Sequence, residues 1–467
     1  MGFNNFNPDT RITELVSEYE AMSLKGTAIF FAEEDFVSLT QYYEKDSQTE
    51  QALEVLDCAL EHYTYSANLL IRKARLLLDI ELAESCLNIL QEAETCMPSD
   101  IQIPILRAKA LIMLDHLDLA ESIIDELKKQ SLSAVQLSKV FVMEAMIYEA
   151  LEQHERVFYA LQAALQEDHN NQEALERLWL CVEISKKYEE SIKLNENILD
   201  INAYSYLAWY NLGHAYCYLG RYDEAIDAYE YAFLTNEKFE FAYRDCAETC
   251  LLKKNYRKAL ECYQEALEHF DPDADIFLRI GQCYQNLGKF EIARSFYNRS
   301  DEMESSNDEV YFHTGECYAN EENWHAAIAY YLRAINIEEK REEYFAALAE
   351  AYYQQNQFDK AEPLFQRACE IAPDQTQYWI QYATFLMEAG QGERAAEVLL
   401  DAERYAVGTQ LLYCRVACLF ACEKRQEALY FFGEALDEDF ALHTVLFDFA
   451  PNLRFDRDVQ ILISIYA

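Results

Sequence analysis

Apolar, aromatic and small residues recur along this chain at the spacing of amphipathic helices, with polar residues between them. The segment Tyr206 to Phe239 shows the pattern most fully. Its marked positions are Trp209, Leu212, Gly213 and Tyr216, followed by Gly220, Tyr222, Ala225, Tyr229 and Ala232. Intervals of three and four residues place such positions on one side of a helix. The segment therefore predicts two consecutive helices, helix A and helix B.

The pattern returns every 34 residues in both directions, which identifies an internal repeat. The register is kept from Glu33 to about Leu442. We place a three-residue insertion in the loop Lys128 to Leu137, and a last unit near Gln410 has one residue fewer between its helices. The other units begin at Glu33, Ala67, Ile101, Ser138, Gln172, Tyr206, Glu240, Ala274, Asp308, Glu342 and Thr376.

Small residues recur at fixed places in the units, because neighbouring helices approach closely only where side chains are small. In helix A this position holds Ala74, Ala108, Ala145, Gly213, Ala247, Gly281, Gly315, Ala349, Ala383 and Ala417. In helix B it holds Ala52, Ala120, Ala225, Ala259, Ala293, Ala327, Ala361, Ala395 and Ala428. Bulky residues such as Tyr229, Tyr263, Tyr297, Tyr331 and Phe365 fill the spaces between. Each unit is thus expected to bury its apolar face against its neighbours.

These residues resemble the tetratricopeptide repeat, whose signature W-x2-L-G-x2-Y appears in helix A of the segment from Tyr206 and whose helix B signature follows. The resemblance implies an all-α fold, a right-handed α-solenoid of about twelve stacked antiparallel helix pairs. We expect an N-terminal capping region, four units, an atypical fifth unit, seven further units and a C-terminal capping helix. Their bounds are 1–32, 33–171, 172–205, 206–442 and 443–467.

The unit 172–205 departs from the pattern at all three small positions, which hold Trp179, Ser191 and Ile198. Packing there is expected to be wider. Two interpretations stay open: a compensated repeat with large residues in place of small ones, or a joint between the arrays 33–171 and 206–442.

Both ends of the array carry apolar helical stretches that can cover the terminal units. The first contains Ile12, Leu15, Val16 and Tyr19, and the second contains Val459, Ile461, Leu462 and Ile465. The alternative for the C-terminal stretch is an exposed surface for self-association.

Charge narrows the class of partner. The chain of 467 residues has 39 Lys and Arg against 83 Asp and Glu, a formal charge of −44. Such a surface repels phosphate backbones and anionic headgroups, so neither nucleic acid nor a membrane is expected as a partner. A basic peptide or protein face is favoured. The N-terminus lacks the pattern of a secretory signal, and the 14 cysteines form no short disulfide framework, so we predict a cytoplasmic protein.

No catalytic motif, cofactor site or metal site is predicted. The sequence has no P-loop, no G-x-G-x-x-G, no G-x-S-x-G and no H-E-x-x-H motif. Cys414, Cys418 and Cys422 share one side of a helix, a spacing that suits packing better than zinc.

The family resemblance implies that helix A lines a concave groove, with its second, fifth, sixth, ninth, twelfth and thirteenth residues pointing inward. Three zones follow. The apolar zone comprises Ile105, Leu106, Ile112, Met113, Val142, Met143 and Met146. The middle zone comprises Tyr210, Asn211, His214, Tyr218, Phe241, Arg244, Glu248, Arg279, Gln282, Gln285 and Asn286. The acidic zone comprises Asp275, Glu309, Glu316, Glu343, Glu350 and Glu388, with Arg279 as the one cation assigned to it.

The sequence therefore predicts a scaffold or adaptor that binds a protein or peptide, preferably a basic segment, in this groove. The alternatives are a regulatory or targeting subunit of a separate enzyme and, much less favoured, an enzyme acting through a cysteine.

Overall fold

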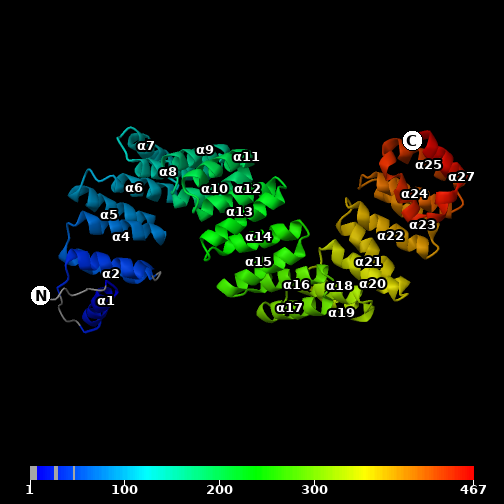
Figure 1. The fold of residues 1–467 in the computed structure, drawn as a ribbon, viewed down its shortest axis with the longest axis horizontal. Coiled ribbons are helices and arrows are strands. Elements are labelled where there is room, and N and C mark those ends of the chain that lie inside the picture. Colours follow the sequence, from blue (N-terminus) through cyan, green and yellow to red (C-terminus); the bar gives the residue numbers. More distant parts are fainter. Residues whose placement is uncertain (1–7, 26–29, 46–47, 467) are drawn as a thin grey trace. The chain divides into compact units, whose positions relative to one another are not determined.

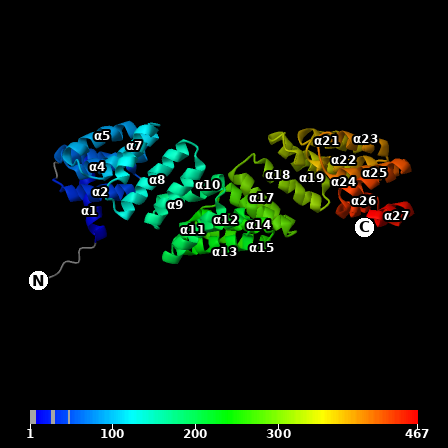
Figure 2. The same cartoon turned by 90° about the horizontal axis from the view of Figure 1, so that it is seen from above.

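The computed structural model describes residues 8–25, 30–45 and 48–466, and every regular element in them is a helix. The all-α fold of antiparallel helix pairs is confirmed. In the described part of the chain, consecutive helices pack in pairs from α2/α3 to α12/α13 in one compact unit and from α16/α17 to α24/α25 in the other. Within each compact unit of the chain, consecutive pairs lie side by side in chain order (Figures 1 and 2).

The chain divides into two such units, residues 1–249 and residues 250–467, with the boundary inside α14. The first unit contains α1 (Pro8–Lys25), α2 (Glu33–Lys45), α3 (Thr49–His62), α4 (Ala67–Asp79), α5 (Ala83–Cys96), α6 (Gln102–Met113), α7 (Leu117–Lys128), α8 (Ala134–Ala150), α9 (His154–Glu167), α10 (Gln172–Ser185), α11 (Tyr188–Ile201), α12 (Tyr206–Tyr218), α13 (Tyr222–Thr235) and the start of α14 (Glu240–Leu252).

The second unit continues with α15 (Tyr256–His269), α16 (Ala274–Asn286), α17 (Phe290–Met303), α18 (Asp308–Asn320), α19 (Trp324–Ile337), α20 (Glu342–Gln354), α21 (Phe358–Ile371), α22 (Thr376–Glu388), α23 (Gly392–Ala402), α24 (Thr409–Ala421), α25 (Arg425–Glu438), η1 (Phe440–Thr444), α26 (Val445–Phe449), η2 (Pro451–Phe455) and α27 (Arg457–Tyr466).

The repeat is also visible in the backbone. From α4/α5 onward, the turn between the two helices of a pair passes through a residue with positive φ, which allows the chain to reverse within a few residues. Most of these residues are not glycines. They are Glu81, Asp115, Glu152, Lys186, Gly220, Lys254, Gly288, Glu322, Asn356, Gly390 and Glu423. They recur at the interval of the sequence repeat, except across the insertion and the deletion.

The small positions of helix A lie directly against the bulky residues of helix B. A Cβ added to Gly213 would come within 2.8 Å of the Tyr229 ring, and one added to Gly315 would come within 2.7 Å of the Tyr331 ring. Both tyrosines are buried at 2% exposure, so neither ring has free space to move into. The size of these residues therefore fixes how closely the two helices of a pair approach.

The insertion lies within the predicted range from Lys128 to Leu137, but much of that range is helical. The segment from Ala134 belongs to α8 and not to a long loop, so the extra residues lengthen the helix. Ser133 caps this helix by accepting a hydrogen bond from the Gln136 backbone N–H, while the Gln136 side chain accepts one from the Ser133 N–H. This reciprocal cap stabilises the added turn.

The atypical unit has the wider packing that its large residues predict. Helices α10 and α11 are packed less closely than the neighbouring pairs α8/α9 and α12/α13. Trp179 is the residue of this unit that corresponds to Gly213 in the next one, and Asn195 corresponds to Tyr229. The large residue therefore lies on helix A and the smaller one on helix B, the reverse of the usual order. The joint at 172–205 stays a prediction, while the boundary between the two compact units falls at 249/250.

The ends of the array are covered. Tyr19 of α1 is buried beside Phe31, with ring centroids 6.3 Å apart. Val459 of α27 is fully buried against α25, and Leu462 is half-buried in the same cluster. Ile461 and Ile465 remain exposed on the other side of α27. The last helix therefore packs one side against α25 and leaves an apolar surface on the other, and its role as a cap stays a prediction.

Substituting Gly315→Ala should destabilise the protein by about 1–3 kcal/mol, because its new Cβ collides with the buried Tyr331 ring. The double variant Gly315→Ala, Tyr331→Leu should recover most of that loss, since Ala383 and Leu399 form this combination naturally in α22 and α23. Urea unfolding followed by circular dichroism measures both. Equal stability of Gly315→Ala and the parent would contradict the steric explanation.

Candidate protein-binding face

The first helix of each pair presents one side that is not covered by its own partner helix, and we call this side the A-helix face. On α6 and α8 it contains a pocket of about 530 Å³. Four residues of the predicted apolar zone line it: Ile105, Leu106, Met143 and Met146. Val142 is buried, Ile112 is half-buried and Met113 is exposed, and none of these three lines the pocket.

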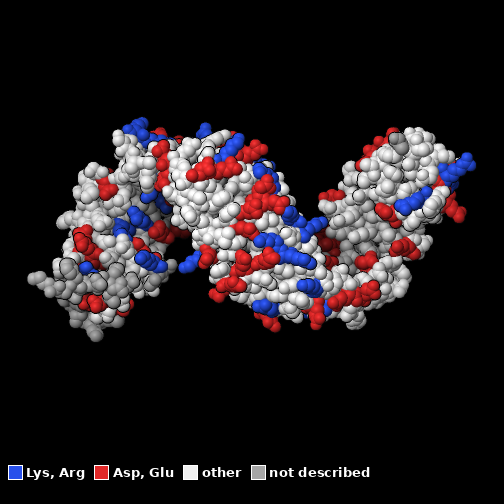
Figure 3. Space-filling model, viewed as in Figure 1, with Lys and Arg blue, Asp and Glu red and all other residues white. Residues whose placement is uncertain are grey.

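Charged side chains also line this pocket. Arg75, Lys109 and Lys139 line it, together with the acidic residues Asp79 and Glu173. Lys109 lies 3.7 Å from the Glu173 carboxylate. Lys and Arg side chains are visible over α4 and α6 in Figure 3. The positive charge near this pocket was not part of the sequence prediction. Arg75, Lys109 and Lys139 occupy inward positions of helix A, but only apolar residues were selected for this zone.

A second pocket, of about 420 Å³, lies where α10, α12 and α14 present this face. Its walls are mainly aromatic. The lining residues are Glu176, Trp179, Leu207, Tyr210, His214, Phe239, Phe241 and Asp245. The structure thus brings Tyr210, His214 and Phe241 of the predicted middle zone into one site, which we call the aromatic pocket.

Asp245 is the largely buried acid of the aromatic pocket. The Tyr210 hydroxyl donates a hydrogen bond to its Oδ2 at 2.6 Å. Burial raises the pKa of Asp245 to about 6, with Glu248 adding to the rise and the Tyr210 bond opposing it. No described Lys or Arg forms an ion pair with this carboxylate.

The rings around Asp245 hold one another in place. The Trp179 indole meets the His214 imidazole edge to face at 5.5 Å, and Tyr210 meets Phe239 at 5.0 Å. Burial lowers the pKa of His214, so this imidazole is neutral at physiological pH. Phe241 is 64% exposed and stands at the mouth of the pocket.

The other middle-zone residues of the first unit take different roles. Asn211 is buried and donates a hydrogen bond to the Leu175 carbonyl at 3.0 Å, so it joins α12 to α10. Arg244 pairs with Glu240 at 2.6 Å. Tyr218 and Glu248 are exposed. Asn211 is therefore structural, while Tyr218 and Glu248 are accessible to a partner.

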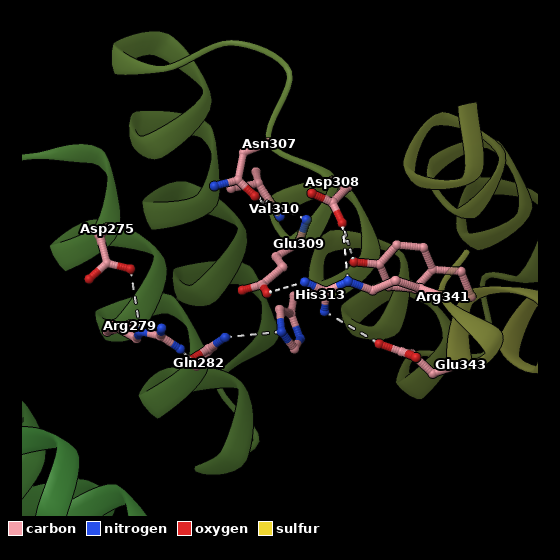
Figure 4. A network of polar contacts seen from close by, with 11 residues as sticks. Asp275, Arg279, Gln282, Asn307, Asp308, Glu309, Val310, His313, Arg341 and Glu343 are labelled. Carbon is pink, nitrogen blue, oxygen red and sulfur yellow. Dashed lines mark hydrogen bonds and ion pairs between the residues drawn. The ribbon is translucent and has the colours of Figure 1, made fainter. Parts of the chain in front are cut away.

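In the second unit the A-helix face carries a polar network over α16, α18 and α20 (Figure 4). Its centre is Arg341, which precedes α20 and lies 2.9 Å from Glu309, 3.4 Å from Glu343 and 3.6 Å from Asp308. Tyr344 donates a hydrogen bond to Asp308 at 2.7 Å. Two carboxylates of the predicted acidic zone are thus partly neutralised by an arginine that the sequence analysis did not include.

His313 occupies the other half of this network (Figure 4). Arg279 pairs with Asp275 at 3.4 Å and donates a hydrogen bond to the Gln282 Oε1 atom at 3.3 Å. That contact orients the Gln282 amide so that its nitrogen faces His313 Nε2 at 3.0 Å. The amide nitrogen can only donate, so the imidazole proton lies on Nδ1, which is buried without a partner.

The remaining predicted residues differ in accessibility. Gln285 donates a hydrogen bond to the half-buried Glu316 at 3.2 Å, and burial raises the pKa of this carboxyl group. Glu350 is exposed and accepts a hydrogen bond from Gln354 at 2.7 Å. Asn286 is exposed and bonds back to its own helix, and Glu388 accepts a hydrogen bond from Tyr353.

Several residues of the face were missed or not assigned to it by sequence reasoning. The sequence identified Trp179 only as a departure from the repeat pattern. Asp245 and His313 were omitted from the groove, although both occupy the sixth position of helix A in their units. The rule that the sixth residue of helix A points into the groove would have identified both. Arg341 lies before its helix, so a rule based on positions within helix A cannot find it.

The cysteine row of α24 serves packing. Cys414 and Cys418 are fully buried, and Cys418 contacts the Met387 sulfur at 3.1 Å. Within the described residues, the ligand atoms of Cys414, Cys418 and Cys422 do not gather within 4.8 Å of one another. Elsewhere, burial raises the pKa of the Cys86, Cys181 and Cys283 thiols to about 12, the opposite of an activated nucleophile.

A search of the described residues finds no helix with the length and hydropathy to cross a membrane.

Replacing His313 by Gln should make the second unit less sensitive to acid. Burial lowers the pKa of His313 to about 4, whereas a histidine in the unfolded chain titrates near 6.5. The unfolded chain therefore takes up a proton first as the pH falls, and the folded state loses stability between about pH 6.5 and 4. Between pH 7.5 and 5.5 the parent should lose about 1 kcal/mol more than the variant.

Urea unfolding at the two pH values measures this difference. The exposed His325 is a matched control in the same unit, and His325→Gln should retain the pH dependence of the parent. If parent and His313→Gln lost equal stability, His313 would not be the buried neutral imidazole described above.

Comparison with protein families gives direct matches to the tetratricopeptide repeat. Three models described by that name match residues 206–239, residues 274–307 and 308–341, and residues 341–385. The first range is the segment in which the repeat is most complete.

Among curated proteins, the BBSome complex member BBS4 from Bos taurus is 30% identical over 106 residues, which are 23% of this chain and 19% of that protein. Among solved structures, the Cut9–Hcn1 hetero-tetramer of the APC/C is 12% identical with a TM-score of 0.40, covering 98% of this chain and 93% of that chain. A thermophilic TPR protein from Thermus thermophilus is 24% identical with a TM-score of 0.34, covering 39% of this chain and 100% of that one. Residues 206–239 and 274–385 of this chain therefore contain tetratricopeptide repeats.

Proposed function

We propose that this chain is a protein-interaction scaffold that binds an extended, basic segment of a partner protein along its A-helix face. The observation that carries the proposal is the aromatic pocket, where exposed and half-buried rings surround an acid without a cation. Aromatic side chains that combine a large contact area with polar neighbours are typical of peptide-binding sites.

Charge supports the same class of partner. The formal charge of −44 attracts basic segments and raises their rate of association at low salt. In the second unit Glu343, Glu350 and Glu388 add acidic side chains to the A-helix face. Arg341 offsets part of this charge, so the attraction comes from the whole face more than from one cluster.

The sequence similarity supports a role in assembly. The 106 matched residues of the bovine relative belong to a protein named as a member of a complex. We infer that this chain likewise takes part in a protein assembly, and that its activity is binding and not catalysis. A cytoplasmic location and self-association through the exposed side of α27 stay predictions.

The variant Glu343→Lys, Glu350→Lys should bind a basic peptide at least about tenfold more weakly than the parent in low salt, because it reverses two charges on the proposed binding face. Glu316 is left unchanged, since a lysine there would be largely buried. The probe is a fluorescent dodecapeptide of alternating Arg and Ser, and fluorescence anisotropy measures its Kd.

The matched control is Glu291→Lys, Glu302→Lys, which makes the same charge change at exposed positions of helix B, on α17. It should change the Kd by no more than about twofold, through the overall charge alone. Equal weakening in both double variants, or none in either, would contradict binding along the A-helix face.

A further inference from the structure

The aromatic pocket combines a flat, electron-rich lining with a largely buried carboxylate. Trp179 comes from α10, Tyr210 and His214 from α12, and Phe241 and Asp245 from α14. Its volume of about 420 Å³ accommodates one long side chain but not a folded element. Such a site selects for a ligand group that interacts with both a ring and a carboxylate.

The protein places its own cations over rings elsewhere, but not here. In the first unit the Arg221 guanidinium lies 4.3 Å from the centroid of Tyr216, and the Arg156 guanidinium lies 5.5 Å from that of Tyr148. Within the described residues, no Lys or Arg lies over the rings that line the aromatic pocket. The pocket therefore contains the aromatic rings and the carboxylate that a cation site needs, but no cation of the described residues occupies it.

The groups that face Asp245 also favour a positive ligand. Glu176 of α10 lines the pocket, and Glu248 of α14 lies close enough to raise the pKa of Asp245. His214 of α12 is neutral, since burial lowers its pKa, so it does not repel a cation. Tyr210 of α12 donates to only one of the carboxylate oxygens, Oδ2. A ligand with N–H donors can bond to the carboxylate without displacing this contact.

We propose that the aromatic pocket receives the guanidinium group of an arginine from the bound basic segment, stacked on the rings and hydrogen-bonded to Asp245. This inference rests on the proposed function. Arginine is favoured over lysine because a planar guanidinium stacks on aromatic faces, pairs with carboxylates through several donors, and is more weakly hydrated than an ammonium group. An apolar side chain would leave the carboxylate buried beside it without a partner.

The atypical unit explains why the pocket lies at this place. Trp179 occupies the position that holds Gly or Ala in nearly all other units, and Asn195 replaces the bulky residue opposite. The indole instead meets His214 of the next A helix and forms a pocket wall. Because a large residue stands at this small position, the Trp179 indole is available as one ring of the proposed cation site.

The test uses full-length protein labelled with 5-fluorotryptophan and observed by fluorine NMR. The probes are capped pentapeptides Ala-Ser-Xaa-Ser-Ala, in which Xaa is arginine, lysine, citrulline or norleucine. The signal of Trp179, one of four tryptophans, is assigned with a Trp179→Phe variant. Trp209 stacks on Tyr231 at 4.7 Å outside the pocket and serves as an internal reference.

The arginine peptide should shift the Trp179 signal and bind at least about tenfold more tightly than the citrulline and norleucine peptides, with lysine between them. Asp245→Asn keeps an oxygen acceptor for Tyr210 but removes the charge, and it should weaken the arginine peptide about tenfold or more. The control Glu189→Gln makes the same charge change at an exposed position of α11 and should leave the Kd within about twofold.

Equal binding of arginine and citrulline peptides, an unmoved Trp179 signal, or an unchanged Kd in Asp245→Asn would overturn the assignment of the pocket. If the dodecapeptide still depends on Glu343 and Glu350 in that case, the proposed function stands and only the arginine site fails. If the pentapeptide binds the pocket while the dodecapeptide ignores charge reversal, the broader proposal fails instead.

Discussion

The close approach of the two helices in each pair is the constraint on which the rest of this structure depends. Gly213, Gly281 and Gly315 lie so near the rings of Tyr229, Tyr297 and Tyr331 that no larger side chain fits without displacement. A small residue opposite a bulky one recurs in most units, because each unit buries its apolar face only against its neighbours. The residues with positive φ, at which the chain reverses, recur at the interval of the sequence repeat. The backbone conformation therefore repeats together with the side-chain pattern.

Relaxing the constraint at one unit changes the surface of the array. Trp179 and Asn195 reverse the usual order of small and large residues, and the helices α10 and α11 are less closely packed than their neighbours. The indole that cannot lie between its own two helices instead contacts His214 of the next A helix. A departure that would weaken a uniform array thereby builds one wall of the aromatic pocket.

Polar groups on the A-helix face are partly buried, and burial shifts their ionisation in opposite directions. Asp245 is held closer to its neutral form, which favours a site where a cation can supply the missing partner. His313 is also held neutral, and its contact with Gln282 links α18 to α16. The same physical cause, burial, thus acts on a pocket carboxyl group in the first unit and on an imidazole that links two helices in the second.

The sequence alone determined the repeat, its register and the helix pairs, because close packing restricts residue size at fixed positions and leaves a periodic trace. Most helix starts followed directly, from Glu33 in α2 to Thr376 in α22. The start of α8 did not, since Ser133 and Gln136 form a cap that the repeat does not contain. Tertiary structure alone decided which groove residues are accessible. Asn211 is buried against Leu175, and Arg341 reaches Glu309 from outside its helix, because partners in space are set by neighbouring units and not by position within one.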